Sequence, residues 1–368
     1  MLRLHSISLT QFKNYSNRSF TFNDRITAIC GNNGVGKTNL LDAIHYLCFT
    51  KSYFTRDHIN VQQGRQGFRI EGELELNGKP EKAVCILRET GKKEFSVNDI
   101  VYERFAHHIG HYPCVIIAPD DIQIIIGGSE ERRRLLDALL SQLNAEYLQQ
   151  LIAYYKILQQ RNSLLKSLAD QGKKPTRMTG SEGDFALLDV IDGQLAKPGE
   201  YIFEKRKEFL VAFLPEVKRL YLEIAKQYED ITLIYQSEML QLSFAELMIA
   251  NRNKDISAQR TTGGIHRDDL VFSLDNQPFR NIASQGQRKS LLFALKLEEM
   301  DVLKDNKGFA PILLLDDVFE KLDEERINSL LERVCVQNDG QVFITDTNEE
   351  RLRQHLESLS INYKLIGL

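Results

Sequence analysis

The sequence predicts an α/β fold, with one lobe built on a mixed sheet with flanking helices and a second lobe that is mainly helical. Three observations predict this fold. A glycine-rich run at 31–38 follows a β-branched apolar run at 26–30 and precedes a helical pattern that begins at Asn39. A fully apolar run at 311–315 ends in two aspartates, as expected for a buried central strand. Between these segments, leucines recur at helical spacing across 132–168 and predict an amphipathic helix of the second lobe.

The glycine-rich run has the P-loop pattern G-x-x-x-x-G-K-T in the context of strand, loop and helix. Its glycines allow backbone N–H groups to close around phosphate oxygens at the positive end of the following helix. Lys37 reaches the β- and γ-phosphates, and the Thr38 hydroxyl can bind Mg²⁺. We therefore expect ATP and Mg²⁺ at this loop, with Lys37 as a catalytic residue and Thr38 as a metal ligand. The expected nucleotide-binding residues are Gly31, Asn32, Asn33, Gly34, Val35, Gly36, Lys37 and Thr38.

The two aspartates that end the apolar run at 311–315 are candidates for the metal and the attacking water. Parallel strands deliver such acids to the phosphate site at their carboxyl edge. We expect Asp316 to coordinate Mg²⁺ through water, as a Walker B residue, and Asp317 to orient the attacking water as a catalytic residue. For either acid, the alternative is an exposed residue at the end of a strand.

A third motif, Ser284-Gln285-Gly286-Gln287, lies upstream of these acids and opens another helical pattern. It resembles the S-G-G-Q signature of ABC-type ATPases, in which the helix N-terminus binds a γ-phosphate held by the other subunit. We expect Ser284 to act as a catalytic residue and Gln285 and Gly286 to contact the nucleotide. A polar helix cap is the alternative. Leu322-Asp323 then follows as a D-loop-like pair, so the first lobe is predicted to be a P-loop ABC-type ATPase lobe.

The ATPase motifs are separated widely enough to predict an insertion. No heptad pattern persists between positions 37 and 316, so a long coiled-coil arm is not expected. We expect residues 1–118 to form the N-terminal part of the ATPase lobe, residues 119–260 a helical insertion lobe, and residues 261–368 the C-terminal part of the ATPase lobe. Residues 172–183 have the composition of a loop within the insertion, and residues 68–76 form a clear strand pattern that ends at an Asn77-Gly78 turn.

Several local patterns resemble the RecF family of bacterial recombination-repair ATPases, in the right order and over almost the whole chain. The tyrosine-to-leucine run at 155–165 and His266-Arg267-Asp268-Asp269 discriminate this family from other ABC-type ATPases. The matching segments are 9–15, 31–44, 132–137, 155–165, 264–270, 284–287 and 315–319. The chain departs from the family pattern at Ala118-Pro119-Asp120-Asp121, at Gly264-Ile265-His266 and at 319–323. The histidine expected after the strand at 341–345 is missing.

The resemblance implies a specific activity. In this family ATP closes a homodimer on duplex or gapped DNA, and the dimer works with RecO and RecR to help load RecA. Weak, DNA-stimulated hydrolysis of ATP is then expected to release the clamp. The resemblance implies that Ser284 acts on the γ-phosphate bound to the opposite subunit.

The overall charge limits how DNA can be bound. The chain has 47 Lys plus Arg against 51 Asp plus Glu, a net charge of −4, which excludes a generally basic nucleic-acid-binding protein. DNA must therefore meet a local basic surface, for which the candidates are Lys51, Arg56, Arg65 and Arg69, with Arg132, Arg133 and Arg134 as a second group. A solvated charged face is the alternative for each of them.

Composition favours a cytoplasmic protein. No apolar stretch approaches the ~20 residues that span a bilayer, so no membrane partner is expected. The five cysteines are scattered through apolar segments, as reduced core residues are. His107, His108 and His111 lie close to Cys114, but no further ligand completes a convincing zinc set, and a polar loop is the favoured interpretation.

Three other functions remain open at this stage. An ATPase subunit of another machine, such as a transporter, would share the nucleotide motifs but has no need of the large insertion or of residues 266–269. A metabolic P-loop kinase has no use for the motif at 284–287. A scaffold that binds ATP with little hydrolysis would retain every motif.

Overall fold

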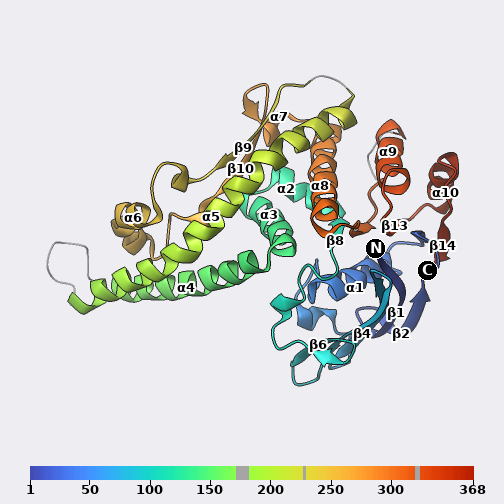
Figure 1. Cartoon of the computed structure of the whole chain (residues 1–368), viewed down its shortest axis with the longest axis horizontal. Coiled ribbons are helices and arrows are strands. Elements are labelled where there is room, and N and C mark those ends of the chain that lie inside the picture. The colour runs from blue at the N-terminus through green and yellow to red at the C-terminus, as the bar shows by residue number, and fades with distance from the viewer. Residues whose placement is uncertain (171–181, 227–228, 320–323) are drawn as a thin grey trace. The chain divides into compact units, whose positions relative to one another are not determined.

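The computed structural model describes residues 1–170, 182–226, 229–319 and 324–368, which divide into two compact units. Unit 1 comprises Met1–Ile122, Arg219–Tyr228 and Ala283–Leu368, and unit 2 comprises Gln123–Lys218 and Glu229–Ile282. Figure 1 colours the chain by residue number, and the first and last thirds of the sequence both contribute to unit 1. Residues 261–282, which we expected in the ATPase lobe, group with unit 2, because a strand within them pairs with an earlier strand of that unit.

The described residues of unit 1 form two sheets. The six-stranded sheet is antiparallel, in the order β2-β1-β4-β5-β6-β7. The five-stranded sheet is parallel, in the order β14-β3-β13-β12-β8. The strands of unit 1 are β1 (Leu2–Phe12), β2 (Tyr15–Thr21), β3 (Ile26–Cys30), β4 (Phe68–Leu76), β5 (Lys79–Leu87), β6 (Lys93–Val97), β7 (Ile100–Val101), β8 (Cys114–Ile117), β12 (Ile312–Leu315), β13 (Val342–Asp346) and β14 (Lys364–Gly367).

The parallel sheet explains the two apolar runs in the sequence. Every residue of β3 and β12 is buried, because both strands lie inside the sheet and are covered on both faces. The antiparallel sheet instead shows alternation, as in β4, which has the predicted bounds and ends at Asn77 and Gly78 with φ of 52° and 78°. The predicted strand and its turn are confirmed.

The P-loop helix lies in the core of unit 1. The helices of this unit are α1 (Lys37–Phe49), α8 (Gln285–Lys307), α9 (Glu324–Leu331) and α10 (Glu349–Ser358). From Leu40 to Phe49 every residue of α1 is buried, and one apolar cluster joins this helix to strands of both sheets. A helix that is covered on all sides needs no amphipathic pattern, which is why the apolar residues of α1 are not confined to one face.

Unit 2 combines helices with a small antiparallel sheet in the order β11-β10-β9. Its helices are α3 (Ser129–Leu143), α4 (Ala145–Asp170), α5 (Glu182–Ala225, whose last residues belong to unit 1), α6 (Phe244–Ala258) and α7 (Phe279–Ile282); its strands are β9 (Ile231–Gln236), β10 (Asp269–Leu274) and β11 (Gln277–Pro278). The short helix α2 (Ile122–Ile126) joins the two units. None of the helices in the described ranges is long and apolar enough to cross a bilayer.

A helix and a loop were predicted from the sequence within unit 2. The single helix predicted across 132–168 is wrong, because Asn144 is extended and its Oδ1 accepts a hydrogen bond of 3.0 Å from the Tyr147 amide, which begins a new helix. Most of the loop predicted at 172–183 lies outside the described residues, and its last two residues already belong to α5. Within α5, Gly199 leaves room for Phe244 of α6, since a Cβ there would lie 2.5 Å from the ring.

Candidate nucleotide-binding site

The P-loop connects the end of β3 to the start of α1, and two of its glycines adopt conformations that other residues avoid. Gly34 and Gly36 have φ of 82° and 116°. A Cβ at Gly36 would lie 2.6 Å from Asn14 Nδ2 and 2.8 Å from the Tyr15 hydroxyl. Gly36 occupies the N-cap of α1 and has no side chain to bond the first amides of the helix, so these donors point to an anion site.

The loop is held in place by the turn between β1 and β2. Asn14 Nδ2 donates to the Val35 carbonyl at 2.8 Å, and the Tyr15 hydroxyl donates to the Gly36 carbonyl at 3.0 Å. Burial raises the pKa of Tyr15 to about 12, so this donor stays protonated at neutral pH. In the sequence this segment was only part of the family pattern, because its contact with the P-loop depends on how the strands are ordered.

Lys37 is almost completely buried at the start of α1. Its Nζ donates to the carbonyls of Gly31 and Asn32 at 2.9 and 3.3 Å. Lys37 forms no ion pair with any residue that the structure describes. The positive charge is therefore held at the loop by neutral oxygens, as suits a group that meets phosphate.

Asp316 and Thr38 come together from opposite ends of the sequence. The parallel sheet places the ends of β3 and β12 at one edge, with β13 between them. Thr38 Oγ1 donates to Asp316 Oδ2 at 2.9 Å, and Thr345 Oγ1 donates to Asp316 Oδ1 at 2.8 Å. Burial raises the pKa of Asp316, while the two hydroxyl donors oppose that rise. A hydroxyl and a carboxylate in contact supply the hard oxygen donors that Mg²⁺ takes, so these residues fit the metal.

Asp317 follows in a conformation unusual for a residue with a side chain. Its φ is 43°, in the left-handed region, and its amide donates to Thr345 Oγ1 at 2.9 Å. Such strain gathers at functional sites. The D-loop-like pair Leu322-Asp323 lies outside the described residues.

The signature segment is a helix N-terminus with a reciprocal cap. Ser284 Oγ accepts a hydrogen bond of 3.2 Å from the Gln287 amide, and Gln287 Oε1 accepts one of 2.7 Å from the Ser284 amide. Ser284 and Gln285 are exposed. A Cβ at Gly286 would lie 2.4 Å from Arg326 Nη1, so this glycine admits the guanidinium of α9. Within one chain, Ser284 thus acts as a helix cap. Its contact with a γ-phosphate bound to the other subunit stays a prediction.

The candidate DNA-binding residues of unit 1 differ in their surroundings. Lys51, Arg56, Arg65 and Arg69 are all exposed. Arg69, however, lies 2.5 Å from Glu71, a carboxylate that also pairs with Lys82, so the charge of Arg69 is partly offset.

The second group of candidates lies in unit 2, where only Arg134 is exposed. Arg132 is buried and bonds both oxygens of Asp269 at 2.7 and 3.1 Å. Arg133 donates to the Asp268 carbonyl at 2.6 Å, and Arg134 pairs with Glu130 at 2.6 Å. The interpretation of Arg132 as part of a basic surface is wrong, because its guanidinium is used inside the unit.

The histidines considered for zinc serve as polar groups of unit 1. His108 Nε2 lies 2.8 Å from the Leu47 carbonyl, and His111 Nε2 lies 2.8 Å from Glu81. Burial lowers the pKa of His108 to about 4. Among the residues in the described ranges, no three potential ligands come together as a metal site.

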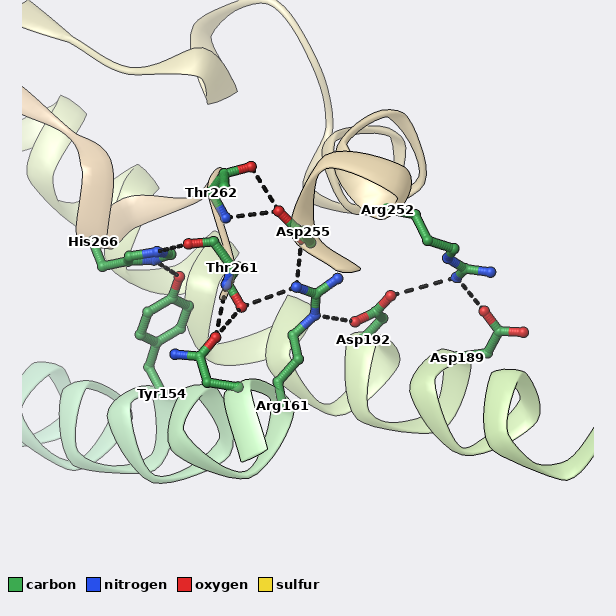
Figure 2. Close-up of polar contacts among 10 residues, drawn as sticks. Tyr154, Arg161, Asp189, Asp192, Arg252, Asp255, Thr261, Thr262 and His266 are labelled. Carbon is green, nitrogen blue, oxygen red and sulfur yellow. Dashed lines mark hydrogen bonds and ion pairs between the residues drawn. The ribbon is translucent and has the colours of Figure 1, made fainter. Parts of the chain in front are cut away.

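The His266-Asp269 motif belongs to a buried polar network of unit 2. His266 Nδ1 lies 2.9 Å from the Tyr154 hydroxyl, and Nε2 lies 3.2 Å from the Thr261 carbonyl. Figure 2 shows Arg161 between Asp192 and Asp255. Its guanidinium lies 2.6 Å from Asp192 and 2.5 Å from Asp255. The same motif supplies Asp268, which accepts hydrogen bonds from Arg206 at 2.8 Å and from the Tyr235 hydroxyl at 2.6 Å. The motif ties helices and strands of unit 2 together.

Comparisons with known proteins agree with this arrangement. The model of the RecF/RecN/SMC N terminal domain matches residues 3–364. The DNA replication and repair protein RecF of Flavobacterium johnsoniae is 41% identical over 368 residues, covering 100% of both chains, and that of Phocaeicola vulgatus is 38% identical, covering 99% of this chain and 96% of the relative.

Solved structures show the same relationship. The recombination mediator protein RecF-ATPrS in the RecFOR pathway superposes with a TM-score of 0.84 at 29% identity, covering 95% of this chain and 93% of that one. A Pyrococcus furiosus Smc head domain, with a TM-score of 0.54 at 15% identity over 100% of this chain and 93% of that one, shares the fold. The chain belongs to the RecF family and carries its SMC-type ATPase domain.

Proposed function

We propose that this protein is an ATP-dependent DNA clamp of recombinational repair and replication restart. ATP would join two copies on duplex or gapped DNA, and the complex would help RecO and RecR to load RecA. The observation that carries the proposal is the contact of Thr38 with Asp316 beside the P-loop, in a chain of this family. A relative described as a recombination mediator in the RecFOR pathway, with ATP, supports it.

Each residue of the site has a role in this proposal. The amides at the start of α1 would hold the phosphates, and Lys37 would exchange its carbonyl partners for β- and γ-phosphate oxygens. Thr38 and Asp316 would hold Mg²⁺, which neutralises phosphate charge when it is bound. Asp317 would orient the attacking water.

The signature serine can serve a cap and a phosphate at once. Its Oγ accepts from the Gln287 amide through a lone pair, which leaves its own proton for a phosphate oxygen. Because Ser284 and Gln285 are exposed, a second copy can reach them. We therefore place Ser284, Gln285 and Gly286 against the nucleotide of the opposite subunit.

DNA would be bound through the exposed cations after α1. Lys51, Arg56, Arg65 and Arg69 are the candidates, and Glu71, which also pairs with Lys82, already offsets part of the charge of Arg69. A protein of net charge −4 that binds through a few such groups should lose DNA affinity steeply as salt rises.

Sedimentation velocity tests the proposal. The wild-type protein is measured without nucleotide, with ADP and with ATP, in the presence and absence of gapped DNA. We expect a dimer only with ATP, and tighter DNA binding by that dimer. Lys37→Ala should lose ATP binding by calorimetry, whereas Ser284→Arg should bind ATP as a monomer. Absence of any ATP effect on assembly or DNA binding would favour an ATP-binding scaffold, and copurification with a permease would favour a transporter subunit.

A further inference from the structure

We propose that Thr345 is a positioning residue for ATP hydrolysis, whose single hydroxyl fixes the carboxylate of Asp316 and the backbone of Asp317 together. This inference rests on the proposed ATPase function. It assigns a role to Thr345, for which no role was predicted from the sequence. Thr345 lies near the end of β13 and is fully buried. Residues 344 and 315 are partners in the ladder, so Thr345 comes level with the two acids as they leave β12.

The hydrogen-bond directions at Thr345 are fixed by chemistry. The Asp317 amide can only donate, and it reaches Thr345 Oγ1 at 2.9 Å. Asp316 as a carboxylate can only accept, so the hydroxyl proton goes to its Oδ1, at 2.8 Å. One hydroxyl thus satisfies a buried acceptor and a backbone donor at the same time.

The contact with the amide matters because Asp317 is strained. In an extended strand, successive side chains point to opposite faces, so two adjacent aspartates would diverge. A φ of 43° at Asp317 breaks that alternation directly after β12. A left-handed residue with a side chain persists only where its surroundings hold it. The hydroxyl of Thr345 is one such restraint, and it sets the direction in which the Asp317 carboxylate leaves the chain.

The contact with Asp316 restrains the carboxylate that faces α1. Thr345 donates to Oδ1 at 2.8 Å, and Thr38 Oγ1 lies 3.1 Å from Oδ1 and 2.9 Å from Oδ2. The two hydroxyls together hold the carboxylate beside the residue that would share the metal with it. A side chain without a hydroxyl at position 345 frees the carboxylate to rotate and leaves the Asp317 amide without this acceptor.

Thr345→Val and Thr345→Ser form a matched pair for the test. Valine keeps the volume and the branch at Cβ but removes the hydroxyl, whereas serine keeps the hydroxyl. Single-turnover hydrolysis of ATP is measured with Mg²⁺ and gapped DNA, and ATP affinity is measured by calorimetry. We expect Thr345→Val to hydrolyse ATP at least tenfold more slowly with less than a threefold change in affinity. Thr345→Ser should stay within threefold of the wild-type rate.

Two outcomes overturn the inference. Thr345→Val hydrolysing at the wild-type rate shows that the hydroxyl is not needed. Thr345→Ser as slow as Thr345→Val shows that packing of the methyl group matters instead. Should Thr345→Val fail to fold, Thr345→Ala takes its place in the comparison with Thr345→Ser. A wild-type protein that does not hydrolyse ATP contradicts the proposed ATPase, which is a separate result.

Discussion

Two buried polar clusters, one in each unit, handle charge in opposite ways. The cluster in unit 2 consists of arginines that each meet two aspartates: Arg161 with Asp192 and Asp255, and Arg206 with Asp137 and Asp268. The nucleotide-site cluster in unit 1 consists of Lys37, Thr38, Asp316, Asp317 and Thr345. There the ammonium of Lys37 meets backbone carbonyls, and the carboxylate of Asp316 meets two hydroxyls.

This difference separates a structural network from a binding site. A buried charge is costly unless an opposite charge offsets it. In the network of unit 2, each buried guanidinium meets carboxylates of the same chain. The nucleotide-site cluster keeps a cation and an acid apart on neutral partners, so phosphate and Mg²⁺ can supply the missing charges. Buried charges that contact only neutral groups thus identify the ligand site more directly than burial does.

The largest effect is expected from breaking the cluster in unit 2. Arg206→Met leaves Asp137 and Asp268 without their shared cation, and removing one partner of a buried ion pair costs about 3–5 kcal/mol. The free energy of unfolding, measured in urea, should fall by that amount. Arg134→Met is the matched control, because the exposed pair with Glu130 contributes at most ~1 kcal/mol. Equal losses in the two variants would show that the network is not the stabilising element.

A smaller effect is expected from Gly36→Ala in the nucleotide-site loop. The added Cβ would clash with Asn14 and Tyr15, and alanine would have to adopt the positive φ of Gly36. The P-loop therefore has to shift. ATP affinity by calorimetry should fall roughly 30- to 100-fold, about 2–3 kcal/mol. Gly64→Ala also has a positive φ, of 78°, but meets open space outside the loop and should leave ATP affinity unchanged. Normal ATP binding by Gly36→Ala would contradict the loop assignment.

Acid should destabilise unit 2 through His266, which contacts Tyr154 and Thr261 beside the cluster. Burial lowers the pKa of His266 to about 4 from its usual 6.5, so between these values the unfolded chain binds more protons than the folded one. The contribution of the neutral His266 to the free energy of unfolding is therefore fully present above pH 6.5 and is lost as the pH falls toward 4. From pH 7 to pH 5 the loss at this histidine should be roughly 2 kcal/mol. Urea titrations at the two pH values should show a smaller loss of unfolding free energy for His266→Gln than for the wild type. An identical loss in both proteins would show that protonation of His266 is not the cause.

The smallest effect concerns the exposed cations. Arg56→Gln should weaken DNA binding and reduce the slope of log affinity against log salt by about 0.9 for each phosphate contact removed. Arg69→Gln should change both quantities less, because Glu71, which also pairs with Lys82, already offsets part of the charge of Arg69. Fluorescence anisotropy with gapped duplex at several salt concentrations measures both. Equal effects of the two substitutions would show that the Arg69–Glu71 pair opens on DNA.

The sequence predicted the elements whose local pattern is strong. The P-loop, the strand before Asp316 and the helix after Ser284 follow from glycine spacing, apolar runs and capping chemistry. The family was also predicted from ordered motifs and is confirmed. The break at Asn144 was missed, because a leucine pattern continues across it while a side-chain cap interrupts the backbone.

Contacts between distant segments could not be read from the sequence. Nothing local to Arg132 indicates that its partner is Asp269, so a run of arginines looked like a surface. The same holds for Asn14 against Val35 and for Thr345 against both acids, since each contact depends on how the strands are ordered.

Hydrogen–deuterium exchange with and without ATP and Mg²⁺ tests the central claim most directly, since it monitors both clusters in one experiment. Peptides that cover 31–38 and 312–317 should become protected when nucleotide binds, and Lys37→Ala should abolish that protection. Peptides that cover Arg161 and 261–268 should already be protected without nucleotide, because their charges are paired within the chain. Unchanged exchange at 31–38 at saturating ATP, or protection that appears first at 261–268, would contradict the assignment of the nucleotide site to the cluster in unit 1.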